Sequence, residues 1–184
     1  MPDEQTDPLS LPFRTQSLSP KKPTRFALTP DLALRTAVAR ALGITAVHAL
    51  TFKGEMRPVG RRDVALEGVL TARVEQPCGI SLAPVVTDIT ESVTRRYIAD
   101  WQDPAGDEVE MPDDDTTDPL PEVIDVGVVA VEALSLALPL YPRAPGVALG
   151  EAVFAGPDAV PLRDGDLKPF AGLAALKDKL EGGS

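Results

Sequence analysis

The sequence predicts an α+β fold: a twisted antiparallel β-sheet with one helix packed on its apolar face and a short N-terminal helix at one end. Apolar and polar residues alternate over residues 64–82 and again over 50–56, which indicates strands with one buried face. Apolar residues recur at helical spacing over 31–42 and 126–138. With 184 residues, 43% of them hydrophobic, the chain is large enough for about one domain with a core.

The N-terminal segment is expected to contain a leader and then a helix. Residues 1–12 include three prolines and show no periodic pattern, so we expect a mobile leader with order beginning after it. A helix of about three turns is expected over 31–42. Thr29 or Asp31 can cap its first turn, and Gly43 ends it.

The sheet is predicted from the longest period-two run in the chain. Its alternating positions are Val64, Leu66, Gly68, Leu70, Ala72, Val74, Gln76, Cys78, Ile80 and Leu82. The run at 50–56 is expected to pair with it as a hairpin, because residues 58–63 have turn chemistry. A third strand follows the break at Pro84 and extends to Tyr97. These strands predict an antiparallel meander without parallel crossovers.

The C-terminal half is expected to contain a loop, a helix and a tail. Residues 100–122 include ten acids and four prolines, which predicts a mobile acidic loop. The helix of 126–138 has Asp125 as its N-cap and is expected to cover the open face of the sheet. Residues 143–184 are rich in Gly and Pro and are expected to end in a short helix. The expected organisation is therefore a leader, a single domain over 13–142 and a tail.

The net charge is strongly negative but unevenly distributed. The formal net charge is −10, and 12 of the 28 acids lie between Tyr97 and Pro142, where no Lys or Arg occurs. The rest of the chain has 28 − 12 = 16 acids and 18 basic residues, so it is nearly neutral. This distribution argues against a protein whose whole surface binds the nucleic-acid backbone.

The sequence gives little support for an enzymatic activity. The chain has one cysteine, Cys78, and one histidine, His48, which excludes an internal disulfide and a thiolate cluster for zinc or iron–sulfur. A Cys–His pair across the first two strands is one interpretation, and a buried, inert Cys78 is the other. No nucleophile elbow, phosphate loop or dinucleotide fingerprint occurs. We therefore expect no catalytic residues, no metal and no cofactor.

The same features favour a cytoplasmic protein that does not insert into a membrane. A lone cysteine fits a reducing compartment. The N-terminus lacks the basic start and apolar run of a secretory signal, and no apolar stretch approaches ~18 residues.

One cluster of basic residues flanks the predicted hairpin turn. It consists of Lys53, Arg57, Arg61 and Arg62. A β-ribbon tip with clustered arginines can reach phosphates, so these residues are candidates for RNA or partner binding. Charges at an exposed sheet edge also prevent aggregation, which is the alternative interpretation.

Three segments, residues 70–85, 124–143 and 168–177, occur in an order and at a spacing that resemble the YceD family, the large ribosomal RNA subunit accumulation proteins. Residues 70–85 are similar to its central motif, in which a strand ends in Gln-x-Cys and continues through Leu-x-Pro-Val. Residues 124–143 and 168–177 resemble the second and third motifs, so the likeness extends from about residue 13 to 180. The motif residues in this chain include Gln76, Cys78, Leu82, Pro84, Asp125 and Glu132.

Most of these motif residues have a structural interpretation. Cys78 and Leu82 lie on the apolar alternation, Pro84 ends a strand, and Asp125 caps a helix. Gln76 differs, because a polar amide at an apolar position must hydrogen-bond inward or mark a site.

The resemblance implies a bacterial or organellar, non-enzymatic factor that supports accumulation and processing of large-subunit ribosomal RNA. Because the chain is acidic, we expect contact with a ribosomal or RNA-processing protein and at most weak binding of rRNA. The alternative is a regulatory partner of the phospholipid-synthesis machinery, because genes of this family commonly neighbour a gene for phospholipid synthesis. Many relatives carry a cysteine-rich cluster that residues 141–146 lack, so no metal site is carried over.

Overall fold

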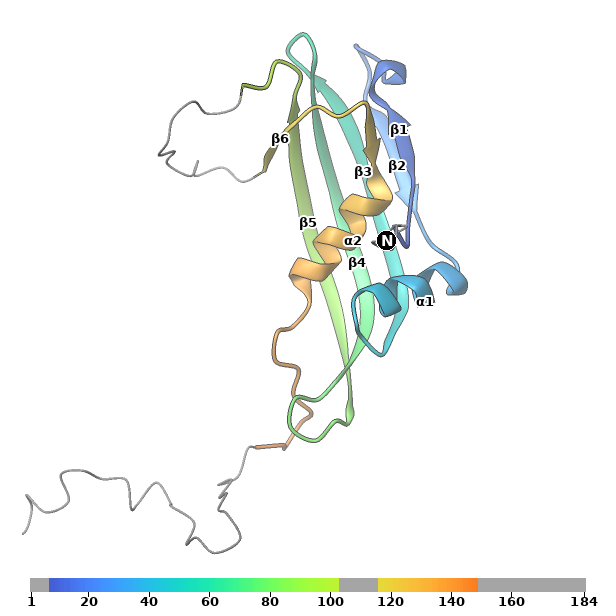
Figure 1. The fold of residues 1–184 in the computed structure, drawn as a ribbon, viewed down its shortest axis with the longest axis vertical. Helices are drawn as coiled ribbons and strands as arrows, with labels where there is room; N and C mark the ends of the chain where they lie inside the picture. Colours follow the sequence, from blue (N-terminus) through green and yellow to red (C-terminus); the bar gives the residue numbers. More distant parts are fainter. Residues whose placement is uncertain (1–6, 103–115, 149–184) are drawn as a thin grey trace, which may run out of the picture. The chain divides into compact units, whose positions relative to one another are not determined.

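The computed structural model describes residues 7–102 and 116–148 and contains a mostly antiparallel sheet and two α-helices (Figure 1). This confirms the predicted α+β class. The elements are β1 (Pro12–Arg14), the 3-10 helix η1 (Thr15–Ser17), β2 (Thr24–Leu28), α1 (Leu32–Ala41), β3 (Ala46–Val59), β4 (Asp63–Pro77), β5 (Pro84–Ile98), β6 (Thr117–Pro119), β7 (Val123–Asp125) and α2 (Val126–Ala137). The chain divides into two units, Met1–Pro145 and Gly146–Ser184, and these elements all belong to the first.

Strands β2 to β6 form one sheet in the order β2-β3-β4-β5-β6. The hairpin of β3 and β4 turns at Gly60, whose φ of +59° suits glycine. Along β4 the alternation places Leu66, Leu70 and Val74 in the core. The period-two prediction is therefore confirmed for this part of the run.

Two glycines face each other across β3 and β4 and make room for an aromatic pair. Gly54 is opposite Gly68, and the rings of Phe26 and Phe52 pack with centroids 5.0 Å apart. A Cβ at Gly54 would lie 2.8 Å from Phe26 Cζ, and one at Gly68 would lie 2.7 Å from Phe52 Cε2. A side chain at Gly68 would thus displace the Phe52 ring, and one at Gly54 would clash with the Glu67 carbonyl of β4 as well as with Phe26.

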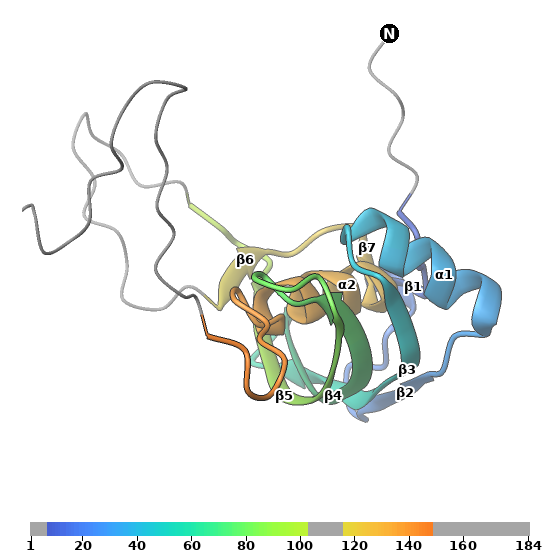
Figure 2. The ribbon, with the colours of Figure 1, turned by 90° about the horizontal axis from the view of Figure 1, so that it is seen from below.

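The two helices begin at aspartate caps. Asp31 accepts a hydrogen bond from the Leu34 amide over 2.9 Å at the start of α1, and Asp125 accepts from the Gly127 amide over 2.8 Å at the start of α2. Helix α2 lies against one face of the sheet (Figure 2) and contacts β4 and β5. Helix α1 packs beside β3. Among the described residues, neither helix is long and apolar enough to cross a membrane.

The predicted leader is wrong for its described part, residues 7–12. Leu9 is 1% exposed and belongs to the core. The Leu11 amide donates to Asp125 Oδ1 over 2.8 Å, and β1 pairs with β7. Long-range packing therefore orders a segment that has no periodic pattern of its own. Residues 1–6 lie outside the described part of the chain.

The predicted acidic loop also needs correction at its C-terminal end. Strand β6 pairs in parallel with the last residues of β5, so the sheet is mixed and not a pure meander. The Arg96 amide donates to the Thr116 carbonyl over 2.8 Å, and the Leu120 amide donates to the Ile98 carbonyl over 2.9 Å. Predictions for residues 103–115, and for the tail and its helix beyond residue 148, fall outside the described residues.

The long period-two run ends earlier than predicted. Strand β4 stops at Pro77, and residues 78–83 connect it to β5. Leu82 is therefore not on an apolar strand face: its φ is +60° and its side chain is 77% exposed. Pro84 begins β5 and does not end a strand.

Candidate functional site

The connection between β4 and β5 forms a tight loop around Cys78. The Cys78 amide donates to the Ala83 carbonyl over 2.8 Å, and the Leu82 amide donates to the Cys78 carbonyl over 3.0 Å. These bonds hold Leu82 at its positive φ, which a bulky residue rarely adopts. The loop therefore has a strained residue whose side chain makes little contact with the protein itself.

This loop is bonded to the segment that follows α2. Gln76 Nε2 donates to the Pro139 carbonyl over 3.3 Å. The Gly79 amide donates to the Pro142 carbonyl over 2.9 Å, and the Ala144 amide lies 3.4 Å from Cys78 Sγ. Two motifs more than 60 residues apart in the chain thus meet at one end of the sheet.

Cys78 is fully buried and free, but its environment favours the thiolate. Hydrogen bonds from the Ser81 side chain and backbone, and from the backbone of Ala144 and Ile80, lower the pKa of the Cys78 thiol to about 6, against the opposing effect of burial. His48 Nε2 lies 3.0 Å from Glu75 Oε2, and no described contact joins His48 to Cys78. The Cys–His interpretation is therefore unsupported.

Three large apolar side chains of the joined loops are exposed. Leu82, Leu140 and Tyr141 are 77%, 88% and 82% exposed. We call these three residues the motif surface. Sequence reasoning did not identify Leu140 and Tyr141, although a signal was present: apolar residues between two prolines, just after a helix end, have no regular face on which to pack.

The other two motif residues act within the fold. Asp125 caps α2 and also accepts hydrogen bonds from Ser10 Oγ and the Leu11 amide, which fixes the N-terminal segment. Glu132, on α2, accepts a hydrogen bond from Arg95 of β5. These contacts connect the helix to the segment before β1 and to β5.

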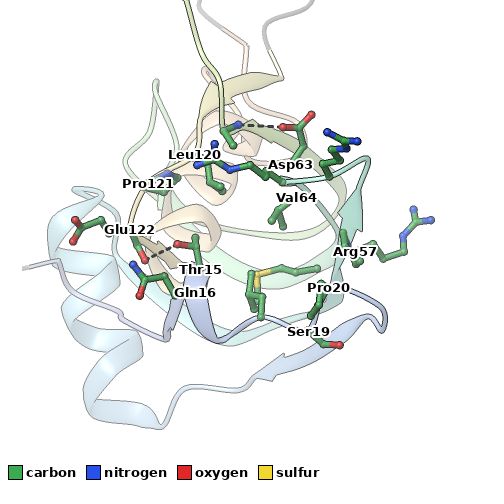
Figure 3. Close-up of a pocket in the computed structure, with 16 residues that line it drawn as sticks. Thr15, Gln16, Ser19, Pro20, Arg57, Asp63, Val64, Leu120, Pro121 and Glu122 are labelled. Atoms are coloured by element: carbon green, nitrogen blue, oxygen red, sulfur yellow. Dashed lines mark hydrogen bonds between the residues drawn. The ribbon is translucent and has the colours of Figure 1, made fainter.

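Lys53 of the predicted basic cluster lies farther along β3, opposite Val69, and the rest of the cluster borders a cavity of about 380 Å³ at the β3–β4 hairpin (Figure 3). Its arginines line this cavity with residues of η1 and with Glu122. Thr15 donates from its amide to the Glu122 carbonyl over 3.0 Å, and the Arg57 side chain points away from these two residues in Figure 3.

Much of the cluster's positive charge is already paired. Arg57 forms ion pairs with Glu67 and, over 3.4 Å, with Glu55. Arg62 pairs with Asp100 over 3.0 Å. Arg61 and Lys53 form no ion pair within the described part of the chain. The hairpin is therefore less attractive to phosphates than its sequence indicates, and its role in binding stays a prediction.

Comparison with protein families gives a match that covers more than half of the chain. The model described as "Large ribosomal RNA subunit accumulation protein YceD" matches residues 66–177. The matched range includes β5, α2 and both loops of the motif surface. No curated protein and no solved structure matches the chain.

Proposed function

The chain belongs to the YceD family of large ribosomal RNA subunit accumulation proteins, and we propose that it supports accumulation of that RNA as a non-enzymatic factor that contacts a ribosomal or RNA-processing protein. The motif surface is the observation that carries the protein contact. It is built from two family motifs that hydrogen bonds join, and it consists of apolar side chains that the fold leaves exposed. The compartment in which we propose that it works is the cytoplasm.

The chemistry of the motif surface favours a protein partner over RNA. Burying one large apolar side chain contributes about 1.5–3 kcal/mol, so the three residues of the motif surface can support a specific contact. Phosphate groups gain nothing from such a surface, and a net charge of −10 repels them at long range. A basic ribosomal protein with an apolar groove meets both requirements, because the groove would bury the motif surface and the positive charge would attract this acidic protein.

A complementation experiment tests this function. In a strain from which the gene is deleted, wild type, Leu140→Gln/Tyr141→Gln and Leu136→Gln are expressed at equal levels. Leu136 is the matched control, because it is an equally exposed apolar residue on α2, outside the motif surface. All three proteins keep the same net charge.

We expect wild type and Leu136→Gln to restore the ratio of large- to small-subunit rRNA and to co-isolate pre-ribosomal particles under native conditions. Leu140→Gln/Tyr141→Gln should lose both, while its thermal unfolding midpoint stays that of wild type, since exposed positions contribute little to stability. Full restoration by this variant would contradict the protein contact. A deletion strain with a normal rRNA ratio would contradict the proposed function as a whole.

A further inference from the structure

A second cavity, of about 370 Å³, lies between α1 and the beginning of β3. Five residues of α1 line it, and they recur at i, i+3, i+4, i+7 and i+8, so they form one face of the helix. In an ordinary amphipathic helix such a face is apolar. Here it carries Arg35, Thr36 and Arg40, and the facing strand segment adds Thr45 and His48. We call this the α1 cavity.

The lining of the α1 cavity combines the two arginines with apolar residues such as Leu32 and Ile44, and it includes no acid. Arg35 and Arg40 form no ion pair within the described ranges. The nearby carboxylates have other partners: Asp31 accepts from the Leu34 amide, and Glu75 pairs with His48. The two arginines therefore differ from Arg57 and Arg62 of the hairpin, whose charges are paired.

Arg35 also has an unsatisfied donor. Its Nε is buried and has no hydrogen-bond partner among the described residues. A buried donor without an acceptor destabilises a protein by about 1–3 kcal/mol. The terminal nitrogens of the same guanidinium are not buried and have no partner among the described residues, so they can donate to the oxygens of a phosphate in the cavity.

We propose that the α1 cavity binds a phosphate group, and that in the function proposed above, on which this assignment rests, the phosphate belongs to RNA. Two guanidinium groups supply the positive charge, and the hydroxyls of Thr36 and Thr45 supply further polar groups on the lining. A charged phosphodiester needs hydrogen-bond donors around it, and the lining of this cavity supplies them.

The position of the α1 cavity supports the RNA assignment. The Thr45 amide donates to the Glu75 carbonyl over 3.0 Å, and His48 pairs with the side chain of the same glutamate. The next residue, Gln76, belongs to the motif loop. Phosphate binding and protein contact would thus occur at the same end of β4, as expected for a factor that holds RNA against a protein.

Binding of a fluorescein-labelled, single-stranded fragment of large-subunit rRNA, measured by fluorescence anisotropy over a range of salt, tests the proposal. The variants of the full chain are Arg35→Ala/Arg40→Ala and, as control, Lys21→Ala/Lys22→Ala. Both remove two positive charges. Lys21 and Lys22 are exposed, and within the described residues they form hydrogen bonds through their backbone amides, which alanine retains.

We expect the arginine variant to bind the RNA at least about tenfold more weakly, because a hydrogen bond to a charged group contributes about 1.5–3 kcal/mol. The slope of log K against log salt should become shallower by about 0.7, which corresponds to the one phosphate that the α1 cavity neutralises. The lysine control should retain the wild-type affinity. Circular dichroism and the unfolding midpoint verify that all variants are folded.

Equal affinity of wild type and the arginine variant would overturn the proposal, as would a wild type that binds neither RNA nor inorganic phosphate. Titration with inorganic phosphate and a nucleoside monophosphate separates the sources. Binding of these small anions without RNA would overturn the RNA assignment and leave a small-molecule phosphate site. None of these outcomes alters the rRNA ratio measured with the motif-surface variant, so failure here is distinguishable from failure of the proposed function.

Discussion

Truncation of Leu9 is expected to destabilise the fold, although the sequence places this residue in a leader. Leu9 is 1% exposed and belongs to the same core as Leu134 of α2. The backbone around it is held by Asp125, which accepts from Ser10 Oγ and the Leu11 amide. The hydrogen bonds of Ser10 and Leu11 to Asp125 thus hold the backbone beside Leu9 in place. Its side chain cannot leave the core unless these bonds break.

The magnitude follows from the buried atoms. Leu9→Ala removes three buried carbons, which at about 0.8 kcal/mol each gives about 2.4 kcal/mol for transfer alone. The cavity left behind adds to this value, and the expected total reaches up to about 5 kcal/mol. Because small domains are stable by about 5–15 kcal/mol, this is a large fraction of the free energy of unfolding.

Equilibrium unfolding in urea, followed by far-UV circular dichroism, measures this effect. With a slope of about 2 kcal/mol per molar, the minimum loss of about 2.4 kcal/mol lowers the urea midpoint by about 1.2 M. Leu136→Ala is the matched control: its side chain is exposed on α2, and the change is expected to stay within about 0.5 kcal/mol. Equal midpoints for the two variants would refute the packing of the N-terminal segment.

Two further predictions concern the helix start and the thiol. Gly127→Ala should lower stability by about 1–3 kcal/mol despite alanine's higher helix propensity, because the new Cβ would lie 2.5 Å from the Leu9 carbonyl oxygen; a variant more stable in urea would contradict this. Cys78 has a folded pKa of about 6, below the ordinary value of 9.0, so its stabilising effect is complete above pH 9 and is lost as the pH falls through 6. The stability difference between wild type and Cys78→Ala should therefore grow between pH 6 and pH 9, and a constant difference would contradict the thiolate.

The parts of the fold that could be predicted are those governed by local chemistry. Alternation from Val64 to Val74 identifies β4, because a strand with one wet face imposes a period of two. Asp31 and Asp125 could be recognised as caps, since a cap needs only a carboxylate and the amides two or three residues ahead.

The parts that could not be predicted depend on partners far away in the chain. Strands β1, β6 and β7 have three residues each, too few for any period to appear. Strand β1 is stabilised by pairing with β7, more than 100 residues later. The strand was also predicted to extend past Pro77, because the apolar alternation continues in the sequence. The loop after Pro77 buries Cys78 and so matches the strand pattern by chance.

In the candidate site, too, local features could be predicted and long-range contacts could not. The motif residues Gln76 and Cys78 could be found from their spacing, but their bonds to the segment after α2 could not. The basic cluster at the hairpin looked unpaired in sequence, yet cross-strand neighbours such as Glu67 pair with it. Like charges close in sequence do not predict a positive surface, because the fold decides which acids lie opposite.

Arginines of α1 can therefore bind phosphate in a chain whose net charge is −10. At physiological salt the field of exposed charges decays over about 8 Å, so an anion near Arg35 and Arg40 responds mainly to the groups lining the α1 cavity. Such a protein would bind isolated RNA weakly and gain most of its selectivity where the RNA is already held by a basic partner against the motif surface.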